Sequence, residues 1–282
     1  MFKILSREDV TTESVQFKID APDIANVCKA GQFVIILGRE TSERIPLTIC
    51  SWNKNEGWIT VVFQKVGAST FELAEFQQND ELFSVAGPLG IPTHTENAGY
   101  TVVIGGGLGI AIATPVAKGF KDAGNDVDVI IGARREDLLF LEDEISSFAN
   151  NLYICTDDGS KGKKGFVTDQ LKELIENGKK YDTCFVVGPP IMMKFVCKLT
   201  KEFGLKTIVS LNTIMLDGTG MCGACRVTIA GKTKFTCVDG PDFDGFEVDW
   251  DEMISRLNAY KDEEKEALER YHASKGLSEK NN

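Results

Sequence analysis

The sequence predicts two domains of different classes: an antiparallel β-barrel over residues 1–97 and a doubly wound, parallel-sheet α/β domain over residues 98–212. The chain has 282 residues, which is more than one ordinary core needs. Strand patterns dominate the first part, and strands alternate with helical patterns in the second. Residues 213–245 break this rhythm, because they concentrate glycine and hold three of the eight cysteines. Residues 246–282 are predicted to form a C-terminal helix and tail.

The elements of the first domain follow from short apolar runs. Apolar and polar residues alternate, or β-branched residues cluster, as is typical of strands. Glycine and proline separate the runs, as expected for the turns of a small barrel. The predicted strands cover residues 15–19, 32–37 and 57–63, another begins at 44–48, and a short helix covers 71–76.

The elements of the second domain alternate in type, which implies βαβ units. The predicted strands cover residues 100–104, 127–131, 152–156, 184–187 and 208–211. The predicted helices cover residues 111–123, 138–148, 167–176 and 191–203. Further on, the pattern predicts a strand over 226–229, a charged amphipathic helix over 250–273 and disorder over 278–282.

Composition and charge exclude several classes of function. Apolar residues make up 43 % and charged residues 26 %, which is the balance of a globular chain. The net charge of −11 argues against binding to nucleic acid. Charges interrupt the N-terminus at once, and glycines and Pro115 interrupt the longest uncharged run, so neither a signal peptide nor a membrane span is expected. We therefore expect a cytoplasmic protein.

The cysteine-rich segment has the spacing of a metal site. It reads D-x4-C-x2-C-x11-C, with Asp217, Cys222, Cys225 and Cys237 as the candidate ligands. Plant-type [2Fe–2S] sites use C-x4-C-x2-C and a distant fourth cysteine, so the aspartate stands at the first ligand position. A thioredoxin-like redox pair, a structural zinc site and buried structural cysteines remain alternatives. The spacing and the glycines favour [2Fe–2S].

The other five cysteines stand singly in the sequence. They are Cys28, Cys50, Cys155, Cys184 and Cys197. We expect them to be thiols of the hydrophobic cores.

A glycine run links the first strand and helix of the second domain. Glycines between Gly105 and Gly109 let the backbone approach a pyrophosphate, and the following helix offers N–H donors. The third fingerprint glycine is missing, since Ile110 stands there, and close helix–strand packing is the alternative. Arg134 and Arg135 end the next strand, where they either hold a 2′-phosphate or are solvated. The choice between NAD and NADP stays open on these grounds.

Two segments of the first domain are suited to a second anion. Arg44 can neutralise a pyrophosphate, and the Gly67-Ala68-Ser69-Thr70 turn offers N–H and hydroxyl donors at a helix start. A surface arginine and an ordinary helix cap are the alternative interpretation.

Together these segments resemble the ferredoxin–NADP reductase superfamily, in which a flavin-binding barrel precedes a nicotinamide-binding domain. Up to about residue 245 the chain resembles the electron-transfer subunits of dihydroorotate dehydrogenase B. Asp217 and the acidic C-terminal helix are similar to the small subunit of NADH-dependent reduced ferredoxin:NADP oxidoreductase, an electron-bifurcating family. The motifs are Arg44-x-Pro46-Leu47-Thr48, Gly67-Ala68-Ser69-Thr70, Gly105 to Gly109, Thr156-Asp157-Asp158-Gly159-Ser160, Lys164-Gly165-x-Val167-Thr168 and Gly188-Pro189-Pro190-x-Met192.

The resemblance implies three cofactors: FAD, a [2Fe–2S] cluster and NAD(H). It assigns a catalytic role beside the flavin to Thr48. The implied flavin-binding residues are Arg44, Ile45, Pro46, Leu47, Thr48, Val62, Phe63, Gln64, Gly67, Ser69 and Thr70. The implied nicotinamide-binding residues are Gly106, Gly107, Gly109, Ile110, Asp157, Asp158, Gly188, Pro189 and Met192. The implied cluster ligands are Asp217, Cys222, Cys225 and Cys237.

The resemblance also implies a function and a partner. Hydride passes between NAD(H) and FAD, and single electrons pass through the cluster to a larger flavin and iron–sulfur subunit, which serves ferredoxin. Residues 246–282 are the expected contact with that subunit. The alternatives are the electron-transfer subunit of an NAD-dependent dihydroorotate dehydrogenase and a flavin-free, metal-stabilised scaffold subunit.

Overall fold

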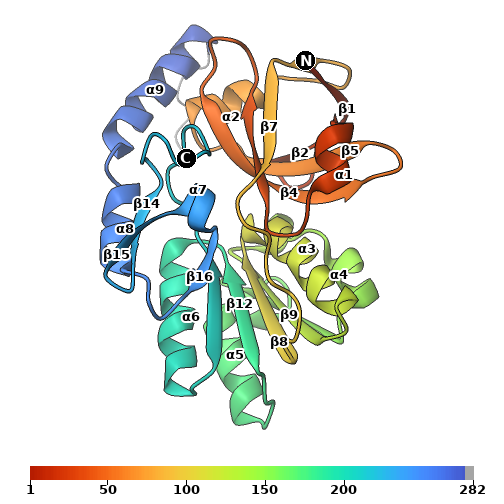
Figure 1. The fold of residues 1–282 in the computed structure, drawn as a ribbon, viewed down its shortest axis with the longest axis vertical. Coiled ribbons are helices and arrows are strands. Elements are labelled where there is room, and N and C mark those ends of the chain that lie inside the picture. The colour runs from red at the N-terminus through yellow and green to blue at the C-terminus, as the bar shows by residue number, and fades with distance from the viewer. Residues whose placement is uncertain (277–282) are drawn as a thin grey trace.

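Two domains stack on each other, with the C-terminal helices along one side (Figure 1). The computed structural model describes residues 1–276. The disorder predicted for 278–282 therefore lies outside the described residues. No helix within residues 1–276 is long and apolar enough to cross a membrane.

The first domain is a curled antiparallel sheet in the order β6-β1-β2-β5-β4-β3-β7. Its edges, β6 and β7, leave the predicted barrel open as a half-barrel. Phe17 and Phe63 pack edge to face in its core, with ring centroids 5.1 Å apart. The strands are β1 (Phe2–Asp9), β2 (Ser14–Asp20), β3 (Phe33–Leu37), β4 (Arg44–Asn53), β5 (Trp58–Gln64), β6 (Glu81–Leu82) and β7 (Ser84–Leu89). The helices are α1 (Pro22–Val27) and α2 (Ala68–Leu73).

The second domain confirms the predicted doubly wound sheet. Its order is β11-β10-β9-β8-β12-β13-β16, and all pairs except β13–β16 are parallel. The strands are β8 (Tyr100–Gly106), β9 (Asp126–Ala133), β10 (Asn151–Thr156), β11 (Lys163–Lys164), β12 (Thr183–Val187), β13 (Lys206–Ser210) and β16 (Asp242–Asp244). The order reverses beside β8, so a ligand crevice is expected outside the carboxyl ends of β8 and β12.

Helices cover both faces of this sheet. The α3 and α4 helices share one apolar core with the sheet, and α5, α6 and α8 share the other. Their bounds are α3 (Gly109–Asp122), α4 (Glu142–Phe148), α5 (Val167–Glu176), α6 (Pro190–Glu202) and α8 (Trp250–Leu257). The five singly placed cysteines are buried, as predicted.

Some elements differ from the sequence-based expectation. The predicted helix over 138–148 is a 3-10 turn at Glu136–Leu138 followed by α4, because Leu141 adopts a left-handed conformation with φ of 63°. The helix expected at 71–76 begins three residues earlier, since the Gly67 turn serves as its N-terminus. The helix expected over 250–273 is divided into α8 and α9 (Lys261–Ser274).

The cysteine segment is bound into the second domain. It forms the hairpin β14 (Arg226–Ile229) and β15 (Lys232–Phe235), then α7 (Thr236–Asp239), and β16 adds an antiparallel edge strand beside β13. That edge strand was not predicted, because its partner strand lies some thirty residues earlier and no local pattern marks the pairing. The segment is therefore continuous with the α/β sheet.

The C-terminal helices connect the two domains. Met253 of α8 is buried beneath the α6 face. Tyr271 of α9 donates a 2.7 Å hydrogen bond to Glu75 and packs against Phe71 of α2. Figure 1 shows α9 beside α2. The rest of α9 is mostly exposed.

The buried carboxylate of Asp128 binds side chains from neighbouring strands, at the end of the sheet opposite the crevice. Asp128 of β9 has a fully buried side chain and lies 3.0 Å from the Lys179 ammonium. Tyr100 and Tyr181 donate hydroxyl hydrogen bonds of 2.8 Å to it, and Asn151 donates one of 2.7 Å. Burial by itself raises the pKa of Asp128, but these hydrogen bonds outweigh it and hold the pKa below its usual value. The carboxylate therefore stabilises the fold as an anion.

Asp128→Ala is expected to lower the free energy of unfolding by about 2 kcal/mol, because it leaves several partly buried donors, the Tyr100 and Tyr181 hydroxyls among them, without their acceptor. Since the folded-state pKa is lowered, the wild-type contribution is present above the unfolded-state pKa of about 3.9 and is lost as the pH falls through the folded value. Urea unfolding at several pH values measures both effects. Asp126→Asn, on the same strand and 67 % exposed, is the control and should change stability by less than about 0.5 kcal/mol. Equal effects of the two substitutions would contradict this account.

Candidate functional site

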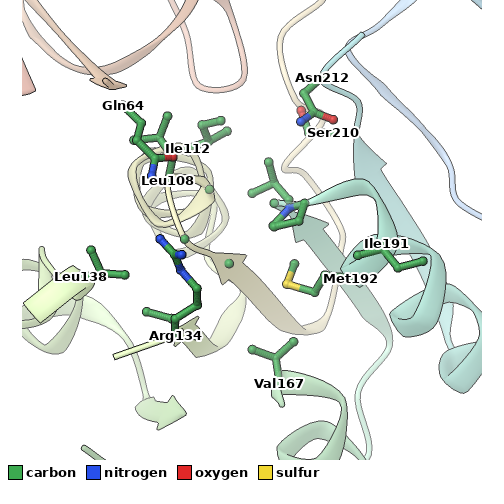
Figure 2. Close-up of a pocket in the computed structure, with 18 of the residues that line it drawn as sticks. Gln64, Leu108, Ile112, Arg134, Leu138, Val167, Ile191, Met192, Ser210 and Asn212 are labelled. Carbon is green, nitrogen blue, oxygen red and sulfur yellow. The ribbon is translucent and has the colours of Figure 1, made fainter. Parts of the chain in front are cut away.

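One large cavity lies between the two domains, at the carboxyl ends of the parallel strands. Its volume is about 1180 Å³, above the roughly 300–1,000 Å³ of most small-molecule sites. Figure 2 shows its wall, with Gln64 from β5, Leu108 and Ile112 around the start of α3, and Met192 from α6. It lies where the reversal of strand order predicts a crevice, and it has room for more than one ring system.

Two glycine turns build the floor of this cavity. A Cβ on Gly109 would overlap the Val187 carbonyl oxygen at the end of β12. Gly107 has φ of +55°, and a Cβ there would meet no atom within 4 Å, so this turn is open toward the cavity. Met192 packs against Gly106, and a Cβ on Gly188 would lie 2.7 Å from the Met192 methyl group. The Gly107, Ile110 and Ala111 amides already donate to backbone carbonyls, so an anion at this turn would meet the other amides at the start of α3.

The β-domain wall comes mainly from β4 and β5. Of the predicted flavin residues, Pro46, Leu47, Thr48, Val62 and Gln64 line the cavity. The Phe63 side chain points instead into the half-barrel core, and Ile45 packs against that core. The predicted nicotinamide residue Ile110 is likewise fully buried in the α3 core. Phe63 and Ile110 could therefore contact a ligand only through their backbone, whereas Ile45 is only partly buried.

The predicted diphosphate-binding groups lie away from the cavity. Arg44 is exposed at the start of β4, about 14 Å along the strand from Thr48 at 3.4 Å per residue. The Thr70 hydroxyl accepts 3.0 Å hydrogen bonds from the Val66 and Gly67 amides. Ser69 donates to the Glu43 carboxylate. Arg44, Gly67, Ser69 and Thr70 therefore lie outside the lining of the cavity.

The ends of β9 and β10 form a third part of the site. Asp157 lines the cavity, whereas Asp158 accepts two hydrogen bonds, of 2.7 and 2.9 Å, from Ser160. The Ser160 hydroxyl lowers the pKa of Asp158. The Gly107 amide donates a 2.8 Å hydrogen bond to the Gly132 carbonyl, which joins the glycine turn to the end of β9.

Two of the predicted cluster ligands lie side by side. The Cys225 Sγ donates to the Cys237 Sγ at 3.2 Å. Two thiolates on one tetrahedral metal, with bonds of about 2.3 Å, would lie about 3.8 Å apart. Burial, and then the neighbouring Cys225, raise the pKa of Cys237 to about 12, so iron would displace a proton on binding.

The other two predicted ligands form a second pair. Asp217 accepts hydrogen bonds from the Thr219 amide at 2.9 Å and the Cys222 amide at 2.8 Å. The Thr219 amide lowers the pKa of Asp217, so this side chain is an anion. Across residues 1–276, however, no three His, Cys, Asp or Glu side chains are grouped closely enough to hold a metal ion. The donor chemistry still fits [2Fe–2S], because each iron takes two protein ligands and the segment supplies two pairs.

The cavity and the thiol pair share two side chains. Phe33 and Met215 line the cavity, and both belong to the apolar cluster that contains Cys225 and Cys237. Gly218 lies against Ile35 and Leu89 of the half-barrel, with no space for a Cβ. The cysteine segment therefore packs directly on the wall of the cavity.

Sequence reasoning missed several residues of this site. Cys50 was expected only as a core thiol, yet it lines the cavity, where burial raises its pKa to about 12. Glu13 reaches the cavity from the turn between β1 and β2, which carries no motif. The rule that ligands bind beyond the carboxyl ends of parallel strands points to Ser210, the last residue of β13, and to Asn212 just after it, both shown in Figure 2.

Comparisons with known families agree with the two halves of this site. Residues 103–198 match the oxidoreductase NAD-binding domain, and residues 212–249 match the iron–sulfur cluster binding domain of dihydroorotate dehydrogenase B. The fold and the site thus define an oxidoreductase subunit with a nicotinamide-binding domain and a cluster-binding domain.

Whole-chain relatives specify the family. The chain is 45 % identical to the dihydroorotate dehydrogenase B (NAD(+)) electron transfer subunit homolog of Thermotoga maritima, covering 98 % of each chain. It is 34 % identical to the corresponding electron transfer subunit of Clostridium perfringens, over 78 % of this chain and 87 % of that one. The chain therefore belongs to the family of dihydroorotate dehydrogenase B electron transfer subunits and their homologues.

A solved structure has the same fold throughout. It is a chain from a study of flavin-based electron bifurcation in NADH-dependent reduced ferredoxin-NADP oxidoreductase. The two chains are 44 % identical with a TM-score of 0.91, covering 96 % of this chain and 98 % of that one. The resemblance inferred from the sequence motifs is confirmed. The predicted cofactors, FAD, [2Fe–2S] and NAD(H), agree with the matched domains and with this flavin-based neighbour.

Gly109→Ala is expected to lower the free energy of unfolding by about 1–3 kcal/mol, because the new methyl group forces the turns after β8 and β12 apart. Thermal unfolding measures the change. Gly119→Ala is the matched control in the same helix, where the nearest atom to the new Cβ is the Thr95 methyl group at 3.2 Å. That variant should change the free energy of unfolding by less than about 1 kcal/mol, because the helix propensity gained offsets a small shift of the Thr95 side chain. If Gly109→Ala proved as stable as the control, the two turns would have more freedom than their packing indicates.

Proposed function

We propose that this chain is the FAD- and [2Fe–2S]-containing electron-transfer subunit of an NADH-dependent reduced ferredoxin:NADP⁺ oxidoreductase. In this role it exchanges hydride with NAD(H) and passes single electrons to a larger flavoprotein subunit, which reacts with ferredoxin. One observation carries the proposal: Phe33 and Met215 belong both to the cavity wall and to the packing around the Cys225–Cys237 pair. A redox ring in the cavity would therefore lie next to the cluster segment.

The side chains of this chain bind and orient the reactants. Gly107 leaves the turn before α3 open to the dinucleotide phosphates, and Gly109 lets this turn pack against the end of β12. In this proposal Thr48, which lines the opposite wall, hydrogen-bonds the edge of the flavin, and Arg44, at the start of the same strand, neutralises its diphosphate. When bound, FAD supplies the conversion between two-electron hydride transfer and single-electron transfer. No general acid from the protein is required.

Each part of the chain has its own task in this proposal. Residues 1–97 bind FAD, 98–212 bind NAD(H), 213–245 hold the cluster and 246–282 contact the partner. Support for the last assignment comes from α9, whose first turn carries three acidic residues and which has no buried residue. The name of the Thermotoga relative, an electron transfer subunit, also supports a larger assembly.

The cofactor content tests the proposal most directly. Anaerobically purified protein should show flavin absorbance and bind about two irons per chain. Asp217→Cys should keep the cluster and change its reduction potential, because a thiolate replaces a carboxylate ligand. Iron analysis, absorption spectra and redox titration measure these effects. Cys225→Ala should lose iron and keep FAD, whereas Cys28→Ala, a buried thiol of the half-barrel core, should keep both. A colourless protein that holds only zinc would overturn the proposal.

The partner distinguishes the two enzymes that use subunits of this family. A tagged chain isolated from its native cells is expected to bring a larger flavin and iron–sulfur subunit, and the complex should reduce NADP⁺ with NADH and reduced ferredoxin. Capture of a dihydroorotate-oxidising flavoprotein, with dihydroorotate-dependent NAD⁺ reduction, would instead assign the chain to dihydroorotate dehydrogenase.

A further inference from the structure

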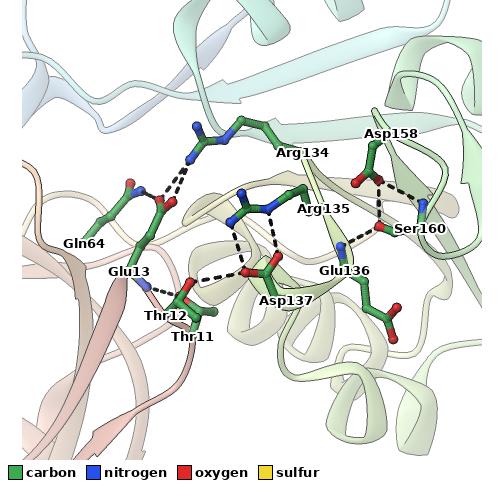
Figure 3. A network of polar contacts seen from close by, with 10 residues as sticks. All are labelled: Thr11, Thr12, Glu13, Gln64, Arg134, Arg135, Glu136, Asp137, Asp158 and Ser160. Atoms are coloured by element: carbon green, nitrogen blue, oxygen red, sulfur yellow. Dashed lines mark hydrogen bonds and ion pairs between the residues drawn. The ribbon is translucent and has the colours of Figure 1, made fainter. Parts of the chain in front are cut away.

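Both arginines after β9 are paired with carboxylates (Figure 3). Arg135 makes two 3.0 Å contacts with Asp137, which also accepts a hydrogen bond from Thr12. Arg134 contacts both carboxylate oxygens of Glu13, at 2.9 and 3.1 Å. Neither side chain is therefore simply solvated.

The Arg134 pair joins the two domains across the cavity. Glu13 belongs to the turn between β1 and β2, whereas Arg134 follows β9. Gln64 of β5 donates a further 2.6 Å hydrogen bond to Glu13. Glu13, Gln64 and Arg134 all line the cavity, but Arg135 does not. Figure 2 shows Arg134 pointing into the cavity, on the side where Gln64 and Leu108 lie.

The position of Arg134 is that of an anion-binding group. It lies two residues after Gly132, whose carbonyl accepts the Gly107 amide of the glycine turn. An arginine beside a helix N-terminus binds phosphate oxygens strongly, because its planar N–H groups reach two of them. The Arg134 side chain is 66 % exposed and that of Glu13 is 32 % exposed. An ion pair this exposed adds little stability, so a stronger anion can displace its carboxylate at small cost.

We propose that Arg134 binds the pyrophosphate of the nicotinamide dinucleotide. In the ligand-free protein, the Glu13 carboxylate pairs with the Arg134 guanidinium instead. Binding then exchanges one anion for another: the pyrophosphate replaces Glu13, and the ion pair between the domains opens. Gln64 retains the released carboxylate through its amide. This inference rests on the proposed function, since it names residues that recognise the same dinucleotide.

Binding of ADP-ribose to the oxidised holoprotein tests the exchange, because this probe carries the pyrophosphate and cannot transfer hydride. Calorimetry should show about tenfold weaker binding for Arg134→Gln. Glu13→Gln should bind about three- to tenfold more tightly, since the competing charge is gone. In the Arg134→Gln background, Glu13→Gln should have no effect. Adenosine, which lacks phosphate, should bind all variants equally.

Arg135→Gln is the matched control, because Arg135 carries the same charge one residue away and lies outside the cavity. Its affinity for ADP-ribose should stay within about twofold of wild type. Wild-type affinity in Arg134→Gln would overturn the inference and leave the proposed function intact. If Glu13→Gln raised the affinity for ADP-ribose equally with and without Arg134, Glu13 would act by long-range repulsion of the ligand. That result would also overturn the inference. If folded wild-type protein bound neither ADP-ribose nor NADH, the proposed function itself would fail.

Discussion

The close approach of the backbone turns after β8 and β12 determines which groups form the edge of the cavity. The turns after β8 and β12 pack so tightly that a Cβ on Gly109 would overlap the Val187 carbonyl oxygen. This contact brings the start of α3 to the edge of the cavity and lets Met192 close against Gly106. The hydrogen bond from the Gly107 amide to the Gly132 carbonyl then places the end of β9 beside the same edge of the cavity. The shape of this edge of the cavity thus depends first on the absence of side chains at Gly106 and Gly109.

The cysteine segment depends on both domains for its position. Its strand β16 extends the parallel sheet, whereas its two buried thiols pack on Phe33 and Ile35 of the half-barrel. Such a segment cannot bury its apolar residues alone, because it is short and glycine-rich. The consequence for function is that the thiol pair and the large cavity share a wall. Hydride chemistry in the cavity and electron transfer through the segment would then take place in adjacent sites.

Much of the fold was predictable because its determinants are local. Alternating apolar residues located β2 and β5, and α5 (Val167–Glu176) has the predicted bounds. Helix breaks were less predictable, since Leu141 is left-handed and packs against the core under α3, a contact that a local pattern does not include. The predicted site residues were likewise only partly correct. Thr48 and Gly107 face the cavity, whereas the Phe63 and Ile110 side chains are buried, because a motif identifies a backbone segment and not the direction of each side chain.

Residue patterns alone were enough to predict the two fold classes, the glycine turn, the ligand spacing from Asp217 to Cys237 and the family. These features depend on residues close together in the chain, and local backbone chemistry constrains them directly. The packing of the folded chain revealed two further contacts: Arg134 pairs with Glu13, 121 residues away, and Phe33 and Met215 connect the cavity with the thiol pair. Such contacts arise when two separately stabilised domains pack together, and no spacing within either domain encodes them.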